Sequence, residues 1–183
     1  MLTQLRQDHA NMARMLHVLQ LKQKALAAGE RPNFQLVREV VDYILGYMED
    51  FTVPLERICS QRLQELAPEC RELTERLSSD YQALRKRLIR LSDDIDMILM
   101  DAVIPMDRFT EDLSAYLIAH RNYLRDEREL LFPLLREHFG DRDMEWLTDA
   151  LPDGASAKLE RLQEAYPELY AELRETQAPE TAA

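Results

Sequence analysis

Residues 51–63 read FTVPLERICSQRL, and in this stretch a proline, Pro54, interrupts a pattern that is otherwise helical. A proline inside a helix removes a backbone N–H and sets its ring against the carbonyl of the preceding turn. The sequence therefore predicts a helix that kinks or restarts here. A lone acid, Glu56, follows among apolar neighbours, and a carboxylate inside a helical core is costly unless it has a partner.

Apolar residues recur at helical spacing on both sides of this stretch and predict four long helices. Glycine and proline mark the breaks between them at Gly29, Pro32, Pro68, Pro105 and Gly140. The predicted helices cover residues 2–28, 33–66, 68–100 and 109–139. Four helices of this length with short connections predict an all-α fold, an antiparallel four-helix up-down bundle.

We expect the bundle to occupy residues 1–139 and a short C-terminal helical extension of the same domain to occupy residues 140–175. The extension should form short helices packed on the bundle. Residues 176–183 are small and polar, and we expect a flexible tail there. The length of 183 residues and the content of only four glycines suit one helical domain.

The formal net charge of −11 disfavours nucleic acid as a partner, because such a protein repels a phosphate backbone. One basic run, Arg85-Lys86-Arg87, lies among aspartates and fits a solvated helix face. No apolar run reaches the roughly 20 residues that span a bilayer, so no membrane partner is expected. The N-terminus lacks the apolar core of a signal peptide, and the two cysteines have no metal or disulfide spacing. We expect a cytoplasmic protein.

Familiar catalytic motifs are missing from the sequence. No histidine follows a glutamate at the Glu-x-x-His spacing of ferritin-like di-iron bundles, and no HExxH, phosphate-binding glycine loop or nucleophile elbow occurs. We therefore predict no catalytic residues.

Four segments occur in an order that carries a family resemblance. They are LRQDH at 5–9, YMEDFTVPLER at 47–57, Asp80-Tyr81, and Arg121 to Glu127 followed by LFP at 131–133. Through them, over roughly residues 2–175, the chain resembles the bacterial hemerythrin-like (HHE cation-binding) domains. That family is a four-helix bundle holding a non-haem di-iron centre between its helices.

The resemblance implies a metal site that has lost most of its histidines. His9, Glu56 and Glu127 match ligand positions of the family. Thr52, Tyr81 and Tyr123 stand where the other ligands would be, and His120, one turn before Tyr123, is an outside candidate. Within the second and fourth helices these positions are four residues apart, so each pair projects from one helix face.

Two interpretations of this altered site remain open. In the first, no cofactor is bound, the tyrosines and the histidine stabilise the carboxylates, and the protein is a non-catalytic sensing, binding or scaffold protein. In the second, iron or manganese binds to His9, Glu56 and Glu127 with Tyr81 or Tyr123, because hard oxygen ligands favour such ions. The protein would then be an atypical mononuclear or di-iron redox protein that handles O2, peroxide or NO.

A homodimer or an unknown protein partner is the expected kind of partner. Trp146 and Tyr166 in the C-terminal segment are the residues that would present apolar surface to it.

Overall fold

The computed structural model describes residues 2–150 and 165–177 of the chain. The sequence predictions for the loop at 151–156, for the amphipathic stretch up to residue 164 and for the tail from residue 178 lie outside these described residues. Within the described ranges the elements are helices, with no strand. None of these helices is long and apolar enough to cross a membrane.

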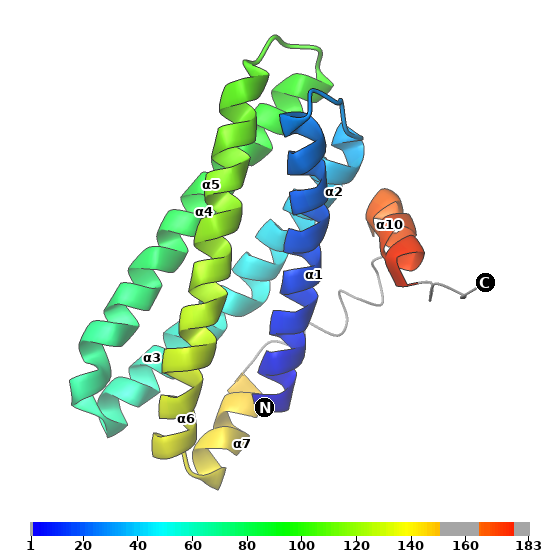
Figure 1. Cartoon of the computed structure of the whole chain (residues 1–183). Helices are drawn as coiled ribbons and strands as arrows, with labels where there is room; N and C mark the ends of the chain where they lie inside the picture. Colours follow the sequence, from blue (N-terminus) through cyan, green and yellow to red (C-terminus); the bar gives the residue numbers. More distant parts are fainter. Residues whose placement is uncertain (1, 151–164, 178–183) are drawn as a thin grey trace.

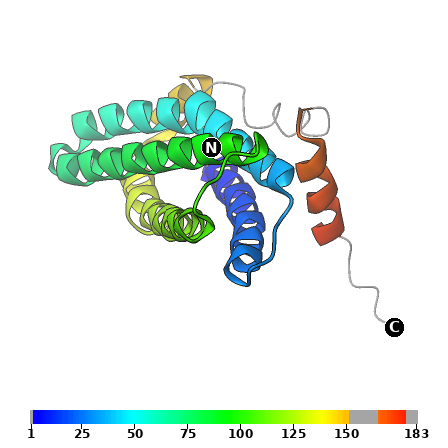
Figure 2. The same ribbon diagram turned by 90° about the horizontal axis from the view of Figure 1, so that it is seen from above.

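The helices form an antiparallel bundle of four rods, and this confirms the predicted fold class (Figure 1). Two rods are single helices, α1 (Leu2–Ala27) and α4 (Arg71–Leu99). The other two are each divided by a π-helical turn. In the second rod η1 (Met48–Thr52) joins α2 (Phe34–Tyr47) to α3 (Val53–Leu66), and in the fourth η3 (Glu127–Leu131) joins α5 (Met106–Asp126) to α6 (Phe132–His138). Figure 2 shows the bundle from above, with α3 and α4 running side by side.

The helix ends follow the local chemistry of the sequence. Gly29 adopts a φ of 80° just after α1, a left-handed conformation that glycine takes without steric cost. The side chain of Asn33 then caps α2 by accepting a hydrogen bond from the backbone N–H of Leu36 at 3.2 Å. A short 3-10 turn, η2 (Pro68–Cys70), leads into α4. The connections are short, so neighbouring rods in sequence pack side by side.

Both π-helical turns lie directly before a helix with a proline in its first turn. Pro54 is the second residue of α3, and Pro133 is the second residue of α6. Proline has no N–H to donate and its ring clashes with the carbonyl four residues earlier. Before each proline the helical turn instead contains one extra residue, and the hydrogen bond spans five residues. The backbone N–H of Val53 donates to Met48 O, and that of Phe132 donates to Glu127 O. The predicted interruption at Pro54 is therefore a π turn within a continuous rod.

Two C-terminal helices pack on the bundle. The first, α7 (Asp141–Ala150), buries Leu147 and is held by an ion pair between Arg62 and Asp143 at 2.6 Å. The second, α10 (Pro167–Gln177), lies beside α2 and buries Leu169 and Leu173 (Figure 1). It extends two residues beyond the boundary predicted at residue 175.

A buried carboxylate holds the start of α10. The Oε2 atom of Glu39, on α2, accepts a hydrogen bond of 2.9 Å from the backbone N–H of Leu169. This N–H lies in the first turn of α10, where helical N–H groups have no partner within the helix. Lys22 on α1 adds an ion pair of 2.9 Å to Glu172. Glu39 thus acts as a distant cap for a helix 130 residues later in the chain.

We expect Glu39→Ala to release α10 from the bundle without unfolding it. The lost charge-assisted hydrogen bond is worth about 1.5 kcal/mol, or roughly tenfold in the opening equilibrium. Amide hydrogen exchange should accelerate over residues 167–177 only. Glu39→Gln keeps an acceptor oxygen and should show a smaller effect, whereas equal acceleration throughout the bundle would contradict a local role for Glu39.

Candidate functional site

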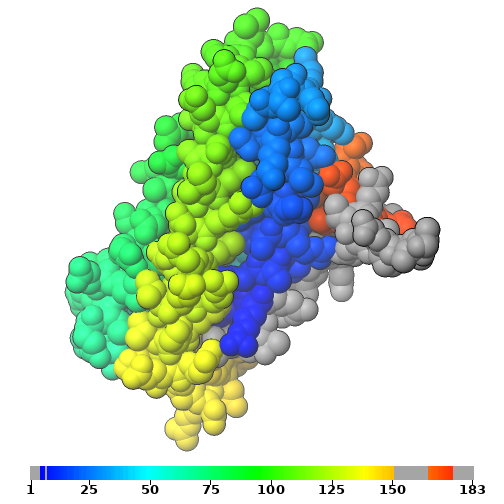
Figure 3. Space-filling model, in the orientation of Figure 1, coloured from blue at the N-terminus to red at the C-terminus, as the bar shows by residue number. Residues whose placement is uncertain are grey.

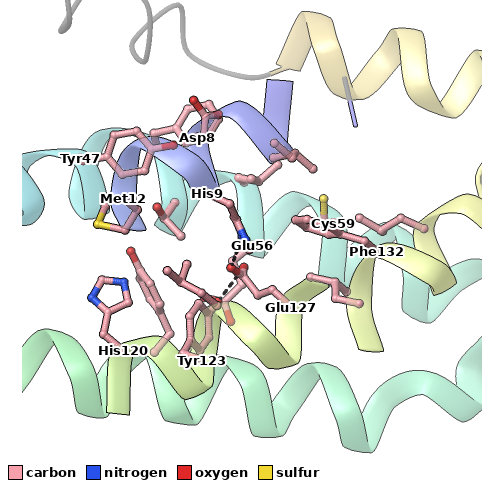
Figure 4. Close-up of a pocket in the computed structure, with 18 residues that line it drawn as sticks. Asp8, His9, Met12, Tyr47, Glu56, Cys59, His120, Tyr123, Glu127 and Phe132 are labelled. Atoms are coloured by element: carbon pink, nitrogen blue, oxygen red, sulfur yellow. Dashed lines mark hydrogen bonds and ion pairs between the residues drawn. The ribbon is translucent and has the colours of Figure 1, made fainter. Parts of the chain in front are cut away.

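A small enclosed chamber lies inside the bundle at the level of the two π turns (Figure 4). Its volume is about 40 Å³, which is enough for one or a few water-sized groups, each needing about 10–15 Å³ by this measure. All four rods contribute to its wall. The predicted site residues His9, Thr52, Glu56, Tyr81, His120, Tyr123 and Glu127 all line it, together with Asp8, Met12, Tyr47 and Cys59 and a ring of leucines and phenylalanines.

Glu127 is the centre of the hydrogen-bond network in the chamber. Its Oε2 atom lies 2.9 Å from Nε2 of His9, and its Oε1 atom accepts a hydrogen bond of 3.0 Å from the Tyr123 hydroxyl. Glu127 begins the π turn η3, and Tyr123 lies one turn earlier on α5. Both oxygens of this buried carboxylate are therefore engaged by side chains of the protein. Figure 4 shows the three side chains converging.

Glu56 faces Glu127 across the chamber and has fewer partners. Its Oε1 atom is buried and makes no hydrogen bond with any described residue. Burial, and then the nearby charge of Glu127, raise the pKa of Glu56 from 4.5 to about 7, while a hydrogen bond from Ser78 lowers it in part. Glu56 also lines an open groove between α3 and α4, so solvent protons can reach it. Glu56 therefore titrates near neutral pH.

The two phenols that replace family ligands behave differently from each other. The rings of Tyr81 and Tyr123 pack at 5.0 Å between centroids. Tyr123 donates to Glu127, but the buried Tyr81 hydroxyl, beside Thr52, makes no hydrogen bond of ordinary geometry with a described residue. Burial first, and the negative charge of Glu127 with it, raise the pKa of both phenols well above the usual value. Both are neutral at physiological pH.

His120, on α5, is a buried neutral imidazole that lines the chamber. Its Nδ1 atom lies 2.8 Å from the Tyr116 hydroxyl, and its ring stands edge to face with the Tyr116 ring. Burial, and then the nearby His9, lower the pKa of His120 from 6.5 to about 3. The other two histidines, His17 and His138, do not line the chamber.

The structure adds residues that the sequence did not single out. Asp8 is 4% exposed and lines the chamber beside Tyr47, and their hydrogen bond contributes to a raised pKa of the Tyr47 phenol, after burial and the charge of Asp8. Both residues belong to the segments LRQDH and YMEDFTVPLER, so the signal was present but pointed to other positions. Cys59 also lines the chamber, and burial raises the pKa of its thiol to about 12, which leaves it an unreactive thiol.

The chamber is strongly acidic for its size. Asp8, Glu56 and Glu127 line it, and none of the described lysines or arginines does. Imidazole and phenol groups and the Thr52 hydroxyl are the polar groups that can donate hydrogen bonds to these acids. The fold and the site together define the class of protein as a four-helix bundle with an acidic polar chamber in its core.

Comparison with protein families agrees with this class. The family model for the hemerythrin HHE cation-binding domain matches residues 1–135, and the chain belongs to that family. No curated protein and no solved structure matched the chain.

The residues of the chamber do not fit the di-iron centre that this family implies. Among the described residues, no three His, Cys, Asp or Glu side chains are grouped so that they could hold a metal ion. Both oxygens of Glu127 are already engaged, and the Nδ1 atom of His120 faces Tyr116 rather than a carboxylate. His9 is left as the one imidazole in contact with a carboxylate of the chamber. This set of donors cannot supply two histidine-rich coordination spheres.

We expect Glu56→Gln to stabilise the protein at alkaline pH. The pKa of Glu56 is near 4.5 when unfolded and about 7 when folded, so the native state binds more protons between these values. The contribution of Glu56 to stability is thus fully present below pH 4.5 and is lost as the pH rises through 7. Glutamine cannot ionise, so the variant should match the wild type at pH 4.5 and exceed it by about 2–3 kcal/mol at pH 8. Urea unfolding at the two pH values measures the difference.

The matched control is Glu145→Gln, which changes an exposed glutamate on α7. It should leave the pH dependence of unfolding as in the wild type. A Glu56→Gln variant that is less stable than the wild type at pH 8 would show that the ionised carboxylate has a favourable partner in solution.

Proposed function

We propose that this protein is a non-catalytic member of its family, in which a hydrogen-bonded polar chamber replaces the di-iron centre, and that it acts as a sensing, binding or scaffold protein. The observation that carries the proposal is the state of Glu127. Each of its oxygens has a protein partner, one from His9 and one from Tyr123, where a metal ligand would keep an oxygen free for the ion.

The electrostatics of the chamber support the same conclusion. A buried anion is stable only when hydrogen bonds or a counter-charge replace its hydration. Glu127 has both kinds of support within reach, since Tyr123 donates to it and a protonated His9 would pair with it. Glu56 reduces its own cost by holding a proton up to a pH of about 7. The bundle therefore does not depend on a metal ion to keep these acids in its core.

A second candidate function rests on Glu56 Oε1 and the Tyr81 hydroxyl, two chamber oxygens that make no hydrogen bond with described residues. Together with His9, Glu127 and Tyr123 they offer mostly hard donors, which suit Fe³⁺ or Mn²⁺. Such an ion, when bound, would supply redox reactivity toward O2, peroxide or NO. To admit it, His9 or Tyr123 has to give up its contact with Glu127, and the buried phenols have to lose their protons.

The proposal also covers the cellular location of the protein and the kind of partner that it binds. We propose a cytoplasmic protein that engages a second copy or another protein through its bundle surface. Trp146 on α7 is 47% exposed and is available for such a contact. Tyr166 is not equally available, because its ring packs edge to face on Tyr43 at 6.0 Å.

The proposed function predicts that protein produced with added iron and manganese contains well below one metal ion per chain and has no visible absorption band. EDTA should leave its melting temperature unchanged. Tyr123→Phe should lower the free energy of unfolding by about 1.5–3 kcal/mol, because it removes a buried donor from a carboxylate. Elemental analysis, visible spectra and thermal melts measure these three quantities.

The matched control is Tyr116→Phe, which removes a buried, hydrogen-bonded phenol from the same helix but outside the chamber. The second candidate makes the opposite prediction. Near-stoichiometric iron with a visible band that disappears in Tyr81→Phe or Tyr123→Phe, and persists in Tyr116→Phe, would replace the metal-free proposal with a ferric-phenolate protein.

A further inference from the structure

A surface groove between α1 and α5 is lined on its charged side by arginine alone. Arg6 comes from α1, Arg121 and Arg125 come from α5, and Arg128 comes from the π turn η3. Small and apolar side chains, including Ala10, Ala13 and Phe132, form its floor. Among the residues that the structure describes, no Asp or Glu lines this groove. The chain as a whole carries 34 acidic and 23 basic residues, so its composition does not lead one to expect a groove whose charged residues are all basic.

The spacing of the arginines makes one continuous basic wall. Arg121, Arg125 and Arg128 are four and then three residues apart, so they project from one helix face over about 10 Å. Arg6 lies opposite them on α1, which runs antiparallel to α5. His9, one turn after Arg6, contacts Glu127, the residue before Arg128. Arg6 therefore lies near Arg128 and not near Arg121. Figure 3 shows α1 and α5 side by side on this face of the molecule.

The present partners of these arginines are weak and exchangeable. The side chains of Arg125 and Arg128 are 52% and 66% exposed, and each forms an ion pair with the acid next to it in the chain, Asp126 and Glu129 respectively. Exposed ion pairs of this kind contribute about 0–1 kcal/mol. Arg121 donates to a neutral amide oxygen, that of Gln20. The guanidinium groups can therefore turn to a bound anion at little cost.

Other grooves of the same protein differ in this respect. The groove between α3 and α4 contains Glu65 and Glu75 beside its arginines, and the groove beside α7 contains Glu65 and Asp143. The groove at the far end of the bundle contains Glu30 and Asp107. In each of them a carboxylate balances the basic groups. The α1–α5 groove differs, because its described lining contains guanidinium groups and no carboxylate, and the acids that pair with Arg125 and Arg128 lie outside it.

We infer that the α1–α5 groove is a binding site for a small organic anion that carries two separated phosphate or carboxylate groups and an apolar body. Guanidinium groups bind such oxyanions with two parallel hydrogen bonds, and the alanine and phenylalanine floor suits the body. The groove measures about 630 Å³, within the range of small-ligand sites. A long polyanion or an anionic membrane would also meet the acidic remainder of the surface, which repels it. This inference is independent of the proposed function of the chamber.

The test is isothermal titration calorimetry of the full chain with hexane-1,6-diol bisphosphate, with adipate as a dicarboxylate that also has an apolar body, and with inorganic phosphate. The expected result is saturable binding of the bisphosphate or of adipate, tighter than that of phosphate and weakened by added salt. The double variant Arg125→Gln/Arg128→Gln should lose at least about tenfold in affinity, because each guanidinium contributes charge-assisted hydrogen bonds. The better of the two probes identifies the oxyanion class.

Two control variants make the test specific. Arg87→Gln/Arg90→Gln removes two exposed arginines from α4, outside the groove, and should change the affinity less than twofold. Tyr123→Phe alters the chamber and should leave the binding unchanged. No saturable binding of any probe, or an equal loss in the α4 double variant, would overturn the inference. Tighter binding of a single-stranded RNA oligonucleotide than of the bisphosphate would overturn it too.

Discussion

The geometry of the interior site depends on two backbone constraints, the missing N–H groups of Pro54 and Pro133. Each proline opens the hydrogen-bond ladder of a long helix by one residue, and each π turn lies immediately before its proline. The extra residue rotates the chain, so that Glu127 within one turn and Glu56 after the other face the same chamber. The rods remain continuous because the widened turns keep their backbone groups bonded. The prolines thus place acidic side chains in the core without ending the helices.

The chamber resolves its excess of negative charge by protons and hydrogen bonds. Three carboxylates near one another with no lysine or arginine would each be costly to ionise. Tyr123 and His9 engage the oxygens of Glu127, and Glu56 keeps its proton over most of the acidic range. The Tyr81 hydroxyl takes no part in this network, although the sequence suggested that both tyrosines would. Glu127 is therefore stabilised by two hydrogen-bond partners in the chamber, whereas Glu56 is stabilised mainly by keeping its proton, with one hydrogen bond from Ser78.

The bundle was largely predictable from the sequence because apolar spacing encodes which face of each helix is buried. The breaks at Gly29, Pro68 and Pro105 separate the four observed rods, and the break at Gly140 separates the last rod from α7. The π turn before Pro133 was missed, although the run LFP resembles the interruption at Pro54. Pro133 lies between the apolar residues Phe132 and Leu134, so the apolar pattern of the predicted helix continues past the proline without a break.

The candidate site was predictable in position but not in its bonding. Positions carried over from the family resemblance all line the chamber, since ligand positions lie on inward faces of the rods. Hydrogen bonds depend on rotamers and on fractions of an ångström, and sequence spacing contains neither. His120 and Tyr116 are four residues apart, so the spacing allows their contact, but it does not show that a phenol and not a carboxylate is the partner of His120. For the arginine groove the spacing gives only the row on α5, because Arg6 and Arg128 are brought together by the antiparallel packing of α1 against α5.

His9 is the point at which the interior and the surface of this protein meet. It lines both the chamber and the arginine groove, together with Leu124 and Phe132, and it is the polar member of these three. Its side chain is 19% exposed, yet its Nε2 atom contacts a carboxylate that is 9% exposed. The imidazole therefore forms part of the wall between the surface groove and the buried acid, with its Nε2 atom on Glu127.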